Sequence, residues 1–251
     1  MKILVVGGLG LIGSQLVEQL GERGHDAVAA SRRTGVDALT AEGLDEALEG
    51  ADVVVDVTNS PSFEDAAVME FFRTATSTLL AAEETAGVQH HVALSVVGCD
   101  RLPDSGYMRA KVAQEELIEA ASIPYSIVRA TQFFEFVAII ADAATEGDTV
   151  RVPAARIQPI AAQDVARAVE AAAVGAPVNG VVEVAGPEAM SFEALIRASL
   201  SARNDGRHVV AAGDARYFGA ALDDADLLPG PDAALGATRF ADWLSRPAMA
   251  G

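Results

Sequence analysis

The segment KILVVGGLGLIG, residues Lys2–Gly13, indicates how the chain folds. Its first half is a short apolar run, typical of a buried parallel strand, and the run ends in Gly7 and Gly8. Apolar residues then recur at helical spacing from Leu11 to Glu22. A strand, a glycine-rich turn and a helix in this order predict the first unit of an α/β fold.

The next hundred residues repeat this alternation of strand and helix. Apolar runs predict strands at 26–31, 51–58, 90–98 and 124–130. Helical periodicity predicts helices at 41–50, at 63–86 with Gly87 closing the helix, and at 106–121. The fold class expected from this pattern is α/β, with a doubly wound parallel (Rossmann-type) sheet covered by helices on both faces.

Beyond about residue 130 the alternation loosens. We expect helices at 132–145, 164–174 and 191–202, strands at 149–153 and 181–186, and a short final helix within 238–246. Asp164 and Ser191 are expected N-caps of their helices. Residues 213–235 are rich in Gly, Asp and Pro and indicate irregular surface. The chain is therefore expected to form a single domain over 1–251, with a small C-terminal substrate lobe built mainly from 131–251.

Composition excludes several functional classes. The chain has 251 residues and is 51% hydrophobic, which is enough to bury a sizeable core. Its 18 basic and 36 acidic residues give a net charge of -18, so we expect no nucleic-acid or membrane partner. The single cysteine, Cys99, excludes an internal disulfide, and the four histidines form no metal-binding motif. We expect no metal site.

No apolar run reaches the length of a membrane span, because Glu135 and Asp142 interrupt the best candidate. The glycines after Lys2 also argue against a secretory leader. We expect a cytoplasmic protein that acts on a small-molecule substrate and could form a homodimer.

The glycine-rich turn is a candidate phosphate site. Glycines let backbone N–H groups approach a pyrophosphate, and the helix that follows adds free N–H donors and partial positive charge. The expected cofactor-binding residues here are Gly7, Gly8, Gly10, Leu11, Ile12 and Gly13.

The end of the second strand favours NADP(H) over NAD(H). A carboxylate at this place binds the ribose 2′-hydroxyl of NAD, whereas this chain has Ser31, Arg32 and Arg33. Two guanidiniums would attract a 2′-phosphate, although they could also be ordinary solvated loop residues. Asp37 could bind the adenine amino group, and Thr58 and Asn59 should lie near the adenine ribose.

Ser95, Tyr107 and Lys111 form the candidate catalytic set. Tyr107 and Lys111 are four residues apart, so they share one face of the predicted helix, and a loop could bring Ser95 opposite Tyr107. Carbonyl reduction needs a proton donor, and a nearby ammonium lowers a phenol's pKa toward working pH. Ser95 could hold the substrate oxygen. Lys111 is notable because the chain's only other lysine is Lys2.

Taken together, GGLGLIG, SRR, DVVVDVTN, LSVVG, YMRAK and PYSIVRATQF resemble the short-chain dehydrogenase/reductase superfamily, over essentially the full chain. PYSIVRATQFFEF and PIAAQDVARAV resemble its atypical, NmrA-like NAD(P)H-binding branch. The resemblance implies that Ser95, Tyr107 and Lys111 are catalytic. It also implies that the nicotinamide is flanked by Ala130, Thr131, Gln132 and Phe133.

Several aromatic residues could line a substrate pocket or simply pack. Phe133, Phe134 and Phe136 lie near the expected nicotinamide position, and Tyr217 with Phe218 could form a lid. The leading hypothesis is an NADPH-dependent oxidoreductase that reduces a small, fairly apolar carbonyl, enone or quinone. One alternative is an NADP(H)-binding redox sensor with little catalysis. Another is an isomerase or dehydratase that recycles its cofactor.

Overall fold

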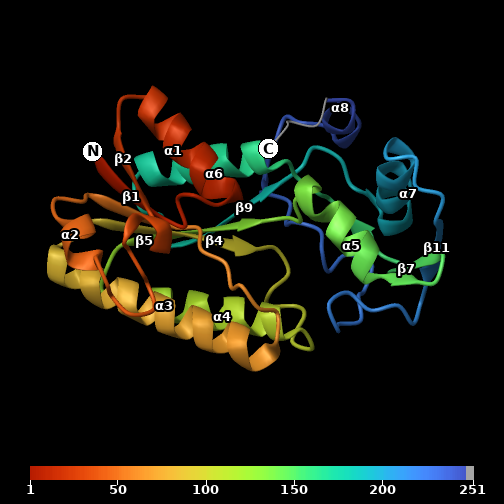
Figure 1. The fold of residues 1–251 in the computed structure, drawn as a ribbon, viewed down its shortest axis with the longest axis horizontal. Coiled ribbons are helices and arrows are strands. Elements are labelled where there is room, and N and C mark those ends of the chain that lie inside the picture. The colour runs from red at the N-terminus through yellow and green to blue at the C-terminus, as the bar shows by residue number, and fades with distance from the viewer. Residues whose placement is uncertain (247–251) are drawn as a thin grey trace.

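The computed structural model describes residues 1–246, and a seven-stranded sheet runs through its centre (Figure 1). The strand order is β12-β9-β5-β4-β3-β1-β2, and every neighbouring pair is parallel. The strands are β1 (Lys2–Val6), β2 (Asp26–Ala30), β3 (Val53–Asp56), β4 (His90–Val96), β5 (Tyr125–Ala130), β9 (Gly180–Ala185) and β12 (Ala234–Leu235). The expected Rossmann-type fold is confirmed.

Helices cover both faces of the sheet (Figure 1). On one face lie α1 (Leu11–Glu22) and α6 (Ala162–Val174), and on the other lie α2 (Leu44–Leu48), α3 (Asp65–Ala86) and α4 (Gly106–Glu119). Ile3 and Val5 of β1 pack on the α1 side, whereas Leu4 and Val6 pack on the α2 and α3 side. A strand buried on both faces reads as a continuous apolar run, which is why KILVV carries no alternation.

The small lobe lies beside the end of the sheet (Figure 1). It contains α5 (Val137–Ala143), α7 (Phe192–Ala202), α8 (Phe240–Leu244), a three-stranded sheet of β6 (Thr145–Glu146), β7 (Thr149–Pro153) and β11 (His208–Ala212), and a ribbon of β8 (Arg156–Ile157) and β10 (Met190–Ser191). Phe134, Phe192 and Tyr217 lie in its core. The same part of the chain also supplies α6, β9 and β12 to the main sheet, and 247–251 lie outside the described residues.

Two expected N-caps have different outcomes. Ser191 accepts a hydrogen bond from the Ala194 N–H at 3.1 Å, so its prediction is confirmed. Asp164, expected at or near the N-cap of α6, lies in the first turn of that helix, but α6 begins after Ala161 and the Asp164 side chain does not cap it. The buried Asp164 carboxylate instead accepts from the Thr238 N–H at 2.8 Å and from Arg167 at 2.8 Å, so it links α6 to the segment before α8.

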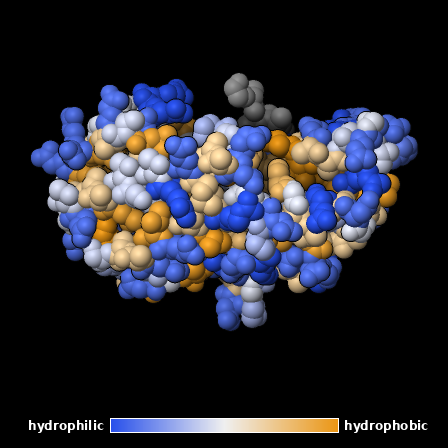
Figure 2. All heavy atoms as spheres, turned by 90° about the horizontal axis from the view of Figure 1, so that it is seen from below, coloured by the Kyte–Doolittle hydropathy of each residue, from blue (hydrophilic) through white to orange (hydrophobic). Residues whose placement is uncertain are grey.

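On the face formed by α3 and α4, polar side chains dominate, and small hydrophobic patches are scattered among these polar residues (Figure 2). Within residues 1–246, no helix is both long and apolar enough to cross a bilayer.

Candidate cofactor and substrate site

The candidate site lies at the carboxyl edge of the sheet. Because β1, β3, β4 and β5 run parallel, the segments that follow them leave from the same edge. The chain passes from β1 to β2 on one side, and β3 lies on the other side of β1. Ligands of open α/β sheets bind at such a switch in strand order.

The glycine turn forms a tightly packed cradle between β1 and α1. Gly7 has a φ of +84°, a conformation that favours glycine. A Cβ atom on Gly8 would lie 2.7 Å from the Val5 carbonyl oxygen, and one on Gly13 would lie 2.2 Å from the Gly7 carbonyl oxygen. Helix α1 begins after Gly10 with no side chain capping its first N–H groups. This backbone fits a pyrophosphate.

The segment after β2 presents two exposed arginines that could bind a phosphate. Arg32 and Arg33 lie in a 3-10 turn, Arg32–Thr34, and both side chains are exposed. Within residues 1–246 neither guanidinium makes a hydrogen bond or ion pair, so both are available to a ligand. Ser31 Oγ is buried without a hydrogen-bond partner in this part of the chain. The Asp37 carboxylate accepts a hydrogen bond from the Leu39 N–H at 2.8 Å and so stabilises a local turn.

The residues after β5 offer unpaired polar groups. Thr131 and Gln132 are buried, and neither the Thr131 hydroxyl nor either polar atom of the Gln132 amide has a hydrogen-bond partner among the described residues. Buried polar groups without partners are costly, so a ligand that satisfies them binds favourably. Ala130 is buried beneath them, and Phe133 stacks on Phe136 with ring centroids 5.5 Å apart. These residues fit the carboxamide and ring of a nicotinamide.

Tyr107 lies at the start of α4 and faces the loop after β3. Its hydroxyl donates to Asn59 Oδ1 at 3.2 Å. Its ring contacts Phe72 of α3 edge-on, with centroids 6.0 Å apart, and lies 5.8 Å from the ring of Phe63. Burial raises the pKa of Tyr107 to about 12. Tyr107 therefore remains protonated throughout the physiological pH range.

A buried chain of hydrogen bonds runs from Thr58 to Lys111. The Thr58 hydroxyl donates to Asp56 Oδ1 at 2.7 Å, and the Gln114 amide donates to Asp56 Oδ2 at 2.9 Å. The Lys111 ammonium donates to the Gln114 side-chain oxygen and, at 2.9 Å, to the Leu94 carbonyl. These hydrogen bonds hold the Lys111 ammonium between α4 and the sheet.

Lys111 does not tune Tyr107 in the way the sequence predicts. The two residues do share a helix face, since the Lys111 ammonium also lies 4.3 Å from the centre of the Phe72 ring. That face packs against α3 and the sheet, however, and the ammonium turns toward Leu94 and Gln114. Burial lowers the pKa of Lys111 to about 8, against the opposing effect of Asp56 and Glu115. The expected lowering of the Tyr107 pKa is thus not what the structure shows.

The Ser95 hydroxyl is engaged by Glu115 and makes no hydrogen bond to Tyr107. It donates to Glu115 Oε1 at 2.5 Å, and the same carboxylate receives Arg129 Nε at 3.0 Å. Arg129 Nη1 also donates to Asp100 Oδ2 at 2.8 Å. Ser95 thus belongs to a buried ionic cluster around Glu115, which lies on the same face of α4 as Tyr107 and Lys111. Cys99 lies against Glu115, and burial raises the pKa of its thiol to about 12, as expected for a packed cysteine.

Three predicted pocket residues have mixed outcomes. Phe134 is a core residue, with its ring 4.9 Å from Phe240 and 5.6 Å from Trp243. Phe133 is partly buried and Phe136 is exposed, so both remain candidates for the pocket wall.

Sequence reasoning missed Asp56, Gln114 and Phe63 as parts of this region. Asp56 is a carboxylate inside an apolar run, VVVD, and an acid in such a run signals a buried polar network. Gln114 and Phe63 carry no comparable local signal, because Gln114 bonds to Asp56 and Phe63 contacts Tyr107, and each of these partners lies more than 40 residues away in the chain.

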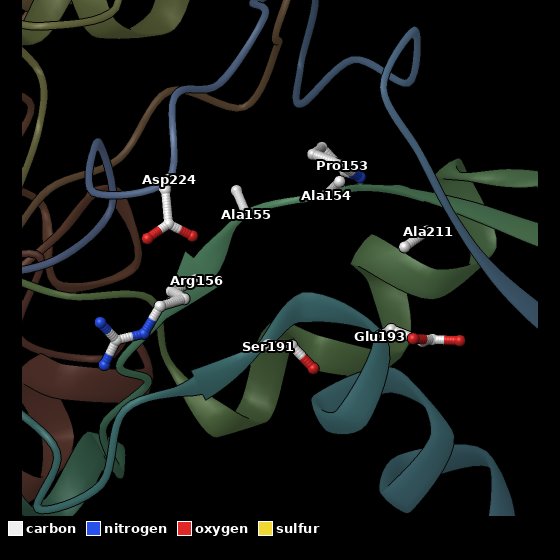
Figure 3. Close-up of a pocket in the computed structure, with 8 residues that line it drawn as sticks. All are labelled: Pro153, Ala154, Ala155, Arg156, Ser191, Glu193, Ala211 and Asp224. Carbon is white, nitrogen blue, oxygen red and sulfur yellow. The ribbon is translucent and has the colours of Figure 1, made fainter.

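A cavity of about 240 Å³ lies in the small lobe between β8, β10 and the loop through Asp224. Figure 3 shows Asp224 and Arg156 toward one end, and Ala211 and Glu193 toward the other. None of the predicted site residues lines it.

Comparison with known protein families shows to which family the chain belongs. Residues 7–174 match the family described as NAD(P)H-binding. The chain belongs to this family. The family match runs from the glycine cradle after β1 to the end of α6, a region that includes Tyr107 and Gln132. The resemblance to the atypical short-chain dehydrogenase/reductase superfamily is confirmed.

Proteins with similar sequences include a reductase and an assembly factor. The chain is 28% identical over 208 residues to the (4-alkanoyl-5-oxo-2,5-dihydrofuran-3-yl)methyl phosphate reductase of Streptomyces griseus, which covers 75% of this chain and 69% of the reductase. It is 25% identical over 149 residues to the photosystem II assembly factor Ycf39 of Synechocystis, which covers 54% of this chain. The chain spans about half the length of that factor, at 46%.

Solved structures share the fold. The UDP-glucose 4-epimerase of Thermus thermophilus in complex with NAD has a TM-score of 0.69 at 21% identity, covering 84% of this chain and 86% of the epimerase. The dTDP-4-dehydrorhamnose reductase of Bacillus anthracis in complex with NADP has a TM-score of 0.66 at 15% identity, covering 97% and 92%.

Proposed function

We propose that the protein is an NADPH-dependent oxidoreductase that reduces a small, fairly apolar carbonyl, enone or quinone. The observation that carries this proposal is the position of Tyr107. Its hydroxyl lies at the sheet edge where the glycine cradle and the unpaired Gln132 amide also lie, so a proton donor accompanies a nicotinamide site. The family match and the similarity to the reductase of Streptomyces griseus support an oxidoreductase.

The residues of the chain would divide the binding work. The glycine cradle and the first turn of α1 would hold the pyrophosphate, and Arg32 with Arg33 would hold the 2′-phosphate of NADP(H). Thr131 and Gln132 would hold the carboxamide. When bound, the nicotinamide supplies the hydride.

Tyr107 would supply the proton. A substrate oxygen that gains negative charge on reduction needs a donor at hydrogen-bond distance, and the protonated phenol provides one. Asn59 would orient the hydroxyl by accepting from it until the substrate oxygen takes its place. Lys111 and Ser95 would act indirectly, by fixing α4 through Gln114 and Glu115.

The test is NADPH oxidation by the purified protein across a panel of benzoquinones, enones and ketones. Turnover of at least one class with NADPH supports the proposal. No turnover on the whole panel, with NADPH bound, would exclude it.

A redox sensor that binds NADP(H) is the second candidate. It is favoured by one observation: Ser95 and Lys111 are both engaged in structural hydrogen bonds, and the Tyr107 pKa is raised rather than lowered. Tight NADPH binding with no turnover would support this reading.

A further inference from the structure

Phe218 occupies an unusual backbone position. The Tyr217 N–H and the Ala220 carbonyl lie 2.8 Å apart, and the reverse pair lies 3.0 Å apart, so Phe218 and Gly219 form the tip of a two-residue turn. Both tip residues have positive φ, +44° and +88°. Such turns use Gly, Asn or Asp, and a bulky aromatic residue there is strained. Strain of this kind is often held at a ligand site.

The turn directs two adjacent aromatic rings to different places. Tyr217 is buried, with its ring 5.7 Å from that of Phe192 in the core of the small lobe. Phe218 is 45% exposed and stacks on Phe63 with ring centroids 6.2 Å apart. Phe63 comes from the loop after β3 and is itself 61% exposed. The pair therefore bridges the main sheet and the small lobe.

This aromatic pair lies next to the proton donor. The Phe63 ring is 5.8 Å from that of Tyr107. Two exposed aromatic rings from separate segments expose apolar surface to water, and a flat conjugated ring would cover it.

Phe218 also lines a cavity on the lobe side. This cavity has a volume of about 270 Å³ and lies between α5, the end of β7, Phe192 of α7 and the Tyr217–Gly219 turn. Its walls are mostly apolar, with Ile140, Val152, Pro153 and Phe192 among them. Ala143 and Ala144 contribute from the end of α5, and the exposed Arg216 lies at the edge of the lining. Such walls suit an unbranched hydrocarbon chain.

We infer that the substrate is a flat conjugated ring carrying an apolar tail. The ring lies against Phe63 and Phe218 beside Tyr107, and the tail enters the cavity, with Phe218 as the wall that both parts share. This inference rests on the proposed function for the role of Tyr107. The two-part binding surface stands on the contacts of Phe218 alone.

Binding of 4-n-alkylphenols tests this directly, because these rings are not reduced. Isothermal titration calorimetry would use the protein saturated with whichever of NADP⁺ and NAD⁺ binds more tightly. The dissociation constant should fall roughly two- to fourfold for each methylene added between ethyl and hexyl. A dissociation constant that does not change with tail length would overturn the inference.

Two variants locate the tail. Ala143→Leu fills the cavity from the last residue of α5 and should remove the length dependence, while ethylphenol still binds. Ala202→Leu places the same side chain on the last residue of α7, outside the cavity lining, and should behave as wild type. Unchanged length dependence in Ala143→Leu would contradict the cavity as the tail site.

Phe218→Asn tests the shared wall without disturbing the turn, because Asn accepts positive φ. The variant should keep the fold, seen as an unchanged far-ultraviolet circular dichroism spectrum. Its dissociation constant for hexylphenol should rise at least tenfold. Wild-type affinity in this variant would contradict the role of Phe218. If no benzoquinone, enone or ketone of the panel is reduced but tail-dependent binding holds, the proposed reductase activity fails and the inferred binding surface stands.

Discussion

The hydroxyl of Tyr107 donates to Asn59 Oδ1 over 3.2 Å and so joins the start of α4 to the loop that follows β3. The two residues lie 48 positions apart in the chain. The bond directs the phenol O–H along the edge of the sheet on which the glycine cradle opens. It therefore orients the group that we assign as proton donor.

Removing the acceptor should reduce turnover. In Asn59→Ala the Tyr107 hydroxyl loses the group that positions it for the incoming substrate oxygen, so kcat should fall roughly two- to tenfold through poorer orientation of the donor. Asn59→Asp keeps an acceptor and should restore most of the rate. Steady-state kinetics with saturating NADPH would measure both. Equal rates in wild type and Asn59→Ala would show that this bond does not matter.

The burial of Lys111 should make stability depend on pH. The pKa of Lys111 is about 8 in the folded protein and 10.5 in the unfolded chain, so below pH 8 both states carry the proton and the fold must bury a charge. Between these values the unfolded chain holds more protons, so stability rises with pH. Relative to Lys111→Met, wild type should gain on the order of 3 kcal/mol across this window.

Urea unfolding of both proteins at pH 7.5 and pH 10 would measure this gain. The Met variant serves as the control for all other titrating groups. If the two stabilities change in parallel with pH, the ammonium is not buried as described.

The glycine cradle predicts opposite effects for two substitutions on one helix. Gly13→Ala places a Cβ 2.2 Å from the Gly7 carbonyl oxygen, and it should destabilise the fold by roughly 1–3 kcal/mol and weaken the cofactor at least tenfold. Gly21→Ala has no atom within 4 Å of its Cβ and should stabilise α1 by roughly 0.5–1 kcal/mol. Thermal unfolding and cofactor titration measure both. A Gly13→Ala variant that binds the cofactor like wild type would contradict the cradle.

The exposed arginines predict the choice of cofactor. Arg32→Asp removes a charge-assisted contact worth about 1.5–3 kcal/mol, so NADPH affinity should fall roughly tenfold to a hundredfold while NADH affinity changes little. Arg73→Asp on α3 makes the same change in net charge on an exposed site and should leave the preference unchanged. Fluorescence titration with both cofactors measures it. A preference that survives Arg32→Asp would refute the role of Arg32.

Local patterns predict the fold well because they depend on neighbours along the chain. The apolar run of β1, the helical periodicity of α1 and the left-handed Gly87 at the end of α3 all follow from such patterns. The strands β6, β8, β10, β11 and β12 escape prediction, since four of them have two residues each and pairing alone defines them.

The candidate site is predictable only in part for the same reason. The spacing of Tyr107 and Lys111 places them on one helix face, but it does not specify what packs there. Phe72 of α3 and the Leu94 carbonyl, which help to determine where the ammonium turns, are tertiary contacts. Gln114 lies three residues along α4, but its amide is held in turn by the distant Asp56. The meeting of Phe63 with Phe218 likewise joins segments more than 150 residues apart.

Tyr107→Phe tests the central claim most directly. The variant keeps the ring packed on Phe72 and removes only the hydroxyl. We predict that NADPH binds with wild-type affinity and that NADPH oxidation with the best quinone or ketone of the panel falls at least a hundredfold, within the range that acid–base catalysis contributes. Equal turnover in wild type and Tyr107→Phe, with NADPH bound equally well, would contradict the assignment of Tyr107 as the proton donor.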